Sequence, residues 1–192
     1  MYALGAGVFA FLVAYLFDWA SLKGLPGGKQ VLIAVVLALH GYALYAAVWA
    51  VERFTLPTAL TWLGWVLLPL SAFLLIYSLF LEIPFTAAYL RDGAGAGMVT
   101  TGTYALVRHP WMLWYTLTLV SLLLVTHSWV LLVAAPAWVA MGVIRVVVQD
   151  RVVFPRMFAD YEQYRHQTPM LVPSWASVAA CVKTLKPREA VK

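Results

Sequence analysis

Two consecutive residues that could bind an anion, Arg108 and His109, stand directly before Pro110 at the end of a polar segment of this chain. Proline suits the first turn of a helix, because the N–H that it lacks would have no partner there. Arg108 and His109 are therefore expected just before a helix, beside free backbone N–H groups and the positive end of the helix dipole. Together these groups could bind a carboxylate. The alternative is that Arg108 only anchors the chain at a membrane surface.

A second polar segment covers residues 145–173. Ionisable residues are costly in an apolar chain, so a cluster of them indicates a functional site. Arg145 could pair with Asp150, about one helical turn later, or meet an anionic substrate. Asp150 could also be a structural partner of Arg145 or Arg151. The candidate residues of this segment are Arg145, Gln149, Asp150, Tyr161 and Tyr164.

The rest of the chain is too apolar for a soluble protein. Of its 192 residues, 64% are hydrophobic and 11% are charged, whereas soluble domains have about 45–50% and about 25%. The 13 Lys and Arg residues form no basic stripe, so nucleic acid is not an expected partner. The single cysteine, Cys181, excludes an intrachain disulfide, and no grouping of residues predicts a metal site.

Stretches without charge predict the elements that carry these segments. A bilayer core about 30 Å thick needs about 20 apolar helical residues. Residues 110–144 are too long for one crossing, and Thr126-His127-Ser128 is the expected turn. The sequence therefore predicts an all-α polytopic membrane protein in one domain, 1–192, whose last two spans form a hairpin. The five expected spans are about 2–20, 30–50, 58–81, 110–126 and 129–148.

Positive charge predicts the orientation of these spans. With five crossings, twelve of the 13 Lys and Arg residues lie on one side and Arg53 lies on the other. Loops rich in Lys and Arg stay in the cytoplasm. We therefore expect an outside N-terminus, a cytoplasmic C-terminus and a membrane that is the inner or plasma membrane of a prokaryote. Both polar segments then face the cytoplasm.

The two polar segments also resemble a known family. Val99-Thr-Thr-Gly102-Thr-Tyr104-Ala-Leu-Val-Arg108-His109-Pro110 is similar to the "V-x-x-G-x-Y-x-x-x-R-H-P-x-Y" loop of the isoprenylcysteine carboxyl methyltransferases. The later segment resembles that family's closing pattern, "R-x-x-x-E-E" followed by "Y-x-x-Y" and a proline-flanked apolar end. The resemblance covers about residues 98–173, across a helical hairpin.

This resemblance implies an integral-membrane methyltransferase that uses S-adenosylmethionine and methylates a lipophilic acceptor reached from the bilayer. Asp150 would meet the cofactor's ammonium group, and Arg145 and His109 would be the catalytic residues. His109 could be a general base, although a carboxylate or thiolate acceptor would need none. The implied cofactor-site elements are about 98–110 and 145–173, and the cofactor-binding residues are Tyr104, Arg108, His109, Pro110, Gln149, Asp150, Tyr161 and Tyr164.

Three positions depart from the family pattern. Gln149 replaces the first Glu, Met112 stands where a Tyr follows His-Pro, and Trp114 stands where Gly is usual. These changes leave the acceptor open among small or lipophilic thiols, amines and carboxylates. Two other functions also stay open: an NADPH-dependent membrane reductase related to sterol reductases, and a membrane protein without catalytic activity. The oligomeric state is not predicted.

Overall fold

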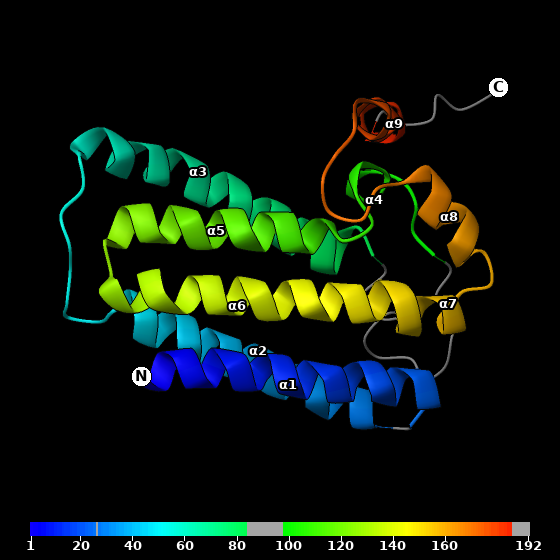
Figure 1. Cartoon of the computed structure of the whole chain (residues 1–192), viewed down its shortest axis with the longest axis horizontal. Coiled ribbons are helices and arrows are strands. Elements are labelled where there is room, and N and C mark those ends of the chain that lie inside the picture. Colours follow the sequence, from blue (N-terminus) through cyan, green and yellow to red (C-terminus); the bar gives the residue numbers. More distant parts are fainter. Residues whose placement is uncertain (26, 84–97, 186–192) are drawn as a thin grey trace.

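The computed structural model describes residues 1–25, 27–83 and 98–185, and these residues form helices and no β-strand (Figure 1). The long helices are α1 (Tyr2–Lys23), α2 (Gly28–Val48), α3 (Thr58–Ile76), α5 (Pro110–Thr126) and α6 (Trp129–Val148). Two π-helical turns, η1 (Tyr77–Leu81) and η3 (Gln149–Val153), extend α3 and α6. The shorter helices are α4 (Thr103–Leu106), α7 (Phe154–Met157), α8 (Tyr161–Gln167) and α9 (Trp175–Leu185).

Four helical stretches of the described chain are long and apolar enough to cross a membrane: Tyr2–Lys23, Gly28–Val48, Thr58–Leu81 and Trp129–Met157. The remaining expected span, the fourth along the chain, is α5, which has 17 residues and a length of about 25 Å. Pro110 fixes its first turn and His127, with a left-handed φ of 54°, ends it. The all-helical fold is thus confirmed, and a count of five crossings stays a prediction.

The long helices pack as two pairs joined by α6. The helices α1 and α2 form one pair, and α3 and α5 form the other. Helix α6 lies between the pairs and contacts both α1 and α5 (Figure 1). The turn from α5 to α6 falls at the expected residues, where the Ser128 hydroxyl accepts a hydrogen bond from the Leu131 N–H at 3.2 Å.

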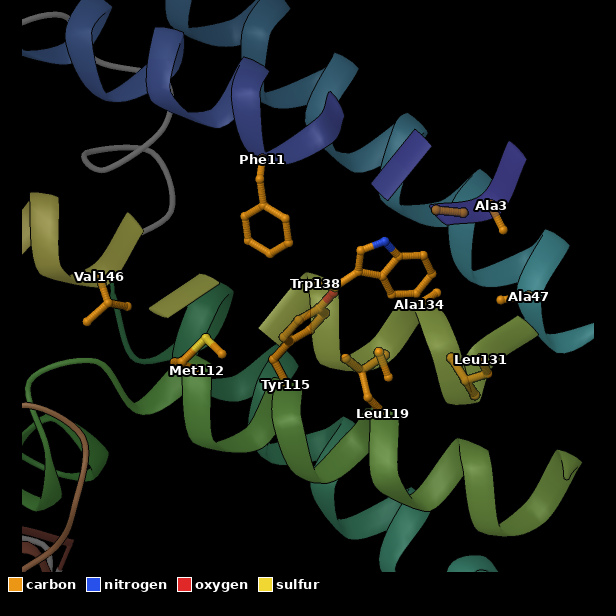
Figure 2. Packing of buried hydrophobic residues seen from close by; sticks show 12 residues of the cluster. Ala3, Phe11, Ala47, Met112, Tyr115, Leu119, Leu131, Ala134, Trp138 and Val146 are labelled. Atoms are coloured by element: carbon orange, nitrogen blue, oxygen red, sulfur yellow. The ribbon is translucent and has the colours of Figure 1, made fainter. Parts of the chain in front are cut away.

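The core is built around the fully buried Trp138 of α6 (Figure 2). A Cβ atom at Gly7 of α1 would lie 2.1 Å from the Trp138 Nε1, so only glycine lets the two helices approach this closely. That Nε1 donates to the Leu4 carbonyl at 3.3 Å. Figure 2 shows Phe11 from α1 and Tyr115 from α5 pointing toward one another in the interior of the bundle, where their ring centroids are 6.2 Å apart.

The short helices gather at one end of the bundle. The N-terminus and the α5–α6 turn lie at the opposite end (Figure 1). Helix α9 lies across the axis of the long helices and packs against α4 (Figure 1). The Gly102 N–H donates to the Thr184 hydroxyl of α9 at 2.9 Å. This end of the bundle therefore holds the described parts of both polar segments.

Candidate functional site

The two polar segments of the sequence meet in the structure. The chain just before α5 is extended, and the Arg108 N–H donates to the Pro169 carbonyl at 2.9 Å. The Tyr164 hydroxyl donates to the Tyr104 carbonyl at 2.6 Å. The α5–α6 hairpin thus brings the second polar segment back to the first.

Arg108 makes the central contact between the segments. Its Nε and Nη2 donate to the two carboxylate oxygens of Asp150, at 2.7 and 3.1 Å. Its Nη1 donates to the carbonyl oxygens of Arg165, at 2.9 Å, and Thr168. The Tyr161 hydroxyl donates to Asp150 at 2.6 Å. Arg108 is 8% exposed and Asp150 is 2% exposed, so this is a buried, two-pronged ion pair.

The carboxylate that Arg108 binds is therefore one of the chain's own. Asp150 has its two oxygens occupied by Arg108 and Tyr161, and it does not line the cavity described below. The pairing of Asp150 with Arg145 does not form, because Arg145 points to another aspartate on α1. The direct contact with a cofactor that the family resemblance implies for Asp150 stays untested, and its occupied oxygens favour a structural role.

His109 lies beside this ion pair and is 1% exposed. Its ring stacks on Phe154, with 5.5 Å between centroids and 11° between planes. The Nε2 is 3.7 Å from the nearer Asp150 oxygen and has no hydrogen-bond partner among the described residues. Burial lowers the pKa of His109 below its ordinary 6.5, so the ring is neutral at pH 7. A neutral imidazole can accept a proton.

A cavity of about 430 Å³ lies next to these residues. Its walls come from the five long helices, the two π-helical turns and the short helices α4, α7 and α8, and it extends from the end with the short helices into the bundle. Most of the lining is apolar; representative residues are Phe11, Val36, Leu44, Leu75 and Leu119. Ligand pockets usually measure about 300–1,000 Å³, so the cavity can hold a small molecule.

A second ion pair forms part of the polar end of this cavity. Arg145 of α6 donates from Nε and Nη2 to the two oxygens of Asp18 of α1, at 2.9 and 2.8 Å. The Gln149 Nε2 also donates to Asp18, at 3.0 Å. The guanidinium lies 5.8 Å from the Trp111 ring centroid. All three polar residues line the cavity.

Several buried polar atoms around the cavity have no hydrogen-bond partner among the described residues. They belong to four residues of α1, of α5 with its N-cap, and of η3, and all four residues line the cavity. A buried polar group without a partner is uncommon in a folded protein and needs a physical explanation. A polar ligand or water would supply the missing partners. The atoms are Ser21 Oγ, His109 Nε2, Tyr115 OH and Gln149 Oε1.

Most residues expected from the sequence line this cavity. The exceptions are Asp150 and Pro110, which stand behind its wall; Pro110 begins α5. Those that line it are Tyr104, Arg108, His109, Arg145, Gln149, Tyr161 and Tyr164.

Asp18 and Ser21 were not expected at the site. One signal could have identified Asp18: it is the single charge within residues 2–20, and a lone charge in an apolar span indicates function. Ser21 carries no such signal.

No group of three or more His, Cys, Asp and Glu side chains within the described ranges could hold a metal ion. Comparisons of the chain with protein-family models, with curated proteins and with solved structures gave no match.

Proposed function

We propose that the protein is an integral-membrane methyltransferase that transfers a methyl group from S-adenosylmethionine to a small or lipophilic acceptor. One observation carries this proposal. The cavity between the helices is apolar along most of its wall, and its polar end presents buried polar atoms that lack partners. Such a cavity suits an acceptor with an apolar body and a cofactor with several polar groups.

The residues present fit this cofactor. It carries an ammonium group and a sulfonium, and the cavity offers the unpartnered Gln149 Oε1 acceptor beside the negative charge of Asp18. It also carries a carboxylate, which the Arg145 guanidinium of the cavity wall matches, and a flat adenine, which the Phe154 ring of the same wall matches. When bound, the cofactor supplies an electrophilic methyl group, whose bond to sulfur breaks as the acceptor's lone pair bonds to the carbon.

The chain's own residues hold the acceptor and exclude water. The apolar wall keeps water from the reacting atoms, and correct positioning alone can contribute about 7–11 kcal/mol to catalysis. Neutral His109 takes the proton from a thiol or amine acceptor, whereas a carboxylate acceptor leaves it unused. The Arg108–Asp150 pair fixes the wall that carries His109. Arg145 remains the second candidate catalytic residue.

The proposal includes the orientation of the protein in the membrane. Helix α5 would be the fourth of five spans, somewhat shorter than the bilayer core, with α3 and α6 beside it. The N-terminus would lie outside, and the end of the bundle that holds the short helices would face the cytoplasm of a prokaryote. The distribution of Lys and Arg supports this orientation.

A methyl-acceptor screen tests the proposed function. The purified protein in lipid nanodiscs is incubated with methyl-labelled S-adenosylmethionine and a panel of isoprenoid acids, lipophilic thiols and lipid amines. We expect label in one acceptor class, and a loss of at least 10-fold in rate for Arg145→Gln. Arg156→Gln, on the exposed surface, is the matched control and retains the rate.

Two results would overturn the proposal. NADPH oxidation coupled to reduction of an unsaturated lipid would assign the protein to the reductases. Absence of label in every acceptor, together with no binding of either cofactor, would assign it to membrane proteins without catalytic activity.

A further inference from the structure

The ion pair between Asp18 and Arg145 joins the first helix of the chain to the polar end of the cavity. The two residues are 127 positions apart, and Asp18 is 5% exposed. Both line the cavity, as does Ser21, one turn after Asp18 on the same helix. The first helix lies outside the segments that carry the family resemblance. Its contribution to the site comes from the structure alone.

This ion pair leaves bonding capacity unused. The Arg145 Nε and Nη2 serve Asp18, which leaves Nη1, on a side chain that is 16% exposed, to donate to another group. The Gln149 amide donates to Asp18 through Nε2, while its Oε1 is buried without a partner and the residue is 6% exposed. The Ser21 Oγ is buried in the same way. An ion pair with a purely structural role would not need such unused donor and acceptor groups beside it.

The unused groups have opposite hydrogen-bonding roles. Arg145 Nη1 is a charged donor, and Gln149 Oε1 is an acceptor beside the negative charge of Asp18. A carboxylate matches the donor, and an ammonium group matches the acceptor and the nearby carboxylate. Buried charges need partners of opposite sign, so a ligand that brings both charges leaves the net charge of the cluster unchanged.

We infer that Asp18, Arg145, Gln149 and Ser21 bind the zwitterionic amino-acid end of a ligand, an inference that rests on the proposed function. Arg145 Nη1 donates to the ligand's carboxylate. Its ammonium donates to Gln149 Oε1 and lies beside Asp18. The Ser21 hydroxyl can serve either group. The amino-acid end of S-adenosylmethionine then enters between α1 and α6, and its nucleoside points toward the aromatic residues beside His109.

Two nucleosides separate this inference from the proposed function. S-adenosylhomocysteine and 5′-methylthioadenosine share the adenosine and the neutral thioether sulfur, but the second lacks the amino-acid end. Dissociation constants for both are measured by calorimetry on purified protein in detergent. The wild-type protein should bind S-adenosylhomocysteine at least about 10-fold more tightly than 5′-methylthioadenosine, because the second ligand cannot make the charge-assisted hydrogen bonds of the amino-acid end.

Asp18→Asn should raise the dissociation constant of S-adenosylhomocysteine about 10-fold and leave that of 5′-methylthioadenosine unchanged. Asp160→Asn is the same substitution at an exposed residue outside the cavity. It should change neither dissociation constant. Asp18→Asn leaves the partly buried Arg145 without its carboxylate, which can prevent folding. The double variant Asp18→Asn/Arg145→Gln removes both charges, and it should bind the two nucleosides with similar affinity.

The outcomes are distinguishable. Suppose that both nucleosides bind the wild type, and that the Asp18 variants reduce the affinity for neither or for both equally. The inference is then wrong and the proposed function stands. If neither nucleoside binds the wild type, the proposed function fails and the inference fails with it.

Discussion

The Arg108–Asp150 pair holds the two polar segments together, and Asp150→Asn tests that role. Removing one partner of a buried ion pair leaves an uncompensated charge and costs about 3–5 kcal/mol. Asp150 lies outside the cavity lining. We therefore expect a clearly lower melting temperature of the ligand-free protein, with unchanged cofactor affinity of the folded fraction. An unchanged melting temperature with a 10-fold loss of affinity would instead place Asp150 on the cofactor.

His109 makes the stability of the protein depend on pH. Because burial lowers its pKa, the unfolded chain binds the proton more readily than the folded one. The stability that neutral His109 contributes is complete above the unfolded pKa of about 6.5 and is lost as the pH falls toward the folded pKa.

Melting temperatures between pH 8 and pH 5 check this dependence. We expect the melting temperature of His109→Gln to fall less steeply below about pH 6.5 than that of the wild type. His166→Gln, at an exposed position, is the control. Parallel curves for wild type and His109→Gln would contradict the neutral, buried state of this ring.

The residue types of the site could be predicted from the sequence better than their partners could. Arg108, His109, Arg145 and Gln149 all line the cavity, as their spacing and polarity suggested. The partner of Arg145 could not be predicted from spacing along a helix, since Asp18 comes from a helix 127 residues away. Tertiary packing of α1 on α6 decides that pairing.

At the scale of elements, a glycine turn positions the first polar segment. Gly102 has a φ of 59°, and a Cβ there would lie 1.8 Å from the Glu82 Oε1. That same oxygen accepts a hydrogen bond from the Thr103 N–H at 2.6 Å. Gly102→Ala should therefore destabilise the protein by about 1–3 kcal/mol through backbone strain, and by more through the displaced carboxylate.

Gly5→Ala is the matched control for this variant, because a Cβ at Gly5 meets nothing within 4 Å. Gly5 lies within α1, where alanine favours the helix by about 1 kcal/mol. Melting temperatures should thus fall for Gly102→Ala and hold or rise for Gly5→Ala. Equal values for the two variants would contradict the strained turn.

Helix positions followed from simple sequence features. The turn at Thr126-His127-Ser128 separates α5 from α6 as expected, because a longer apolar stretch could not cross the bilayer once. The π-helical turns at Tyr77–Leu81 and Gln149–Val153 were not expected. Hydrophobic periodicity does not reveal such local changes of helical pitch.

For the whole molecule, orientation in the membrane is the main prediction still to be tested. Cys181 is only 8% exposed, so a Cys181→Ser background is used with one new cysteine in each variant. Val51→Cys lies in the exposed α2–α3 connection and Lys183→Cys lies on α9, at the other end of the bundle (Figure 1). In intact cells, a membrane-impermeant maleimide should label position 51 and not position 183. The reverse pattern would invert the orientation.

Binding of the cofactor by the purified protein tests the central claim most directly. A ligand at 100 times its dissociation constant stabilises a protein by about 2.7 kcal/mol. Melting curves are recorded in detergent with S-adenosylmethionine, S-adenosylhomocysteine or NADPH at increasing concentration. The proposed methyltransferase predicts a melting temperature that rises with either adenosyl ligand and stays constant with NADPH. A melting temperature that both adenosyl ligands leave unchanged, or that only NADPH raises, would contradict it.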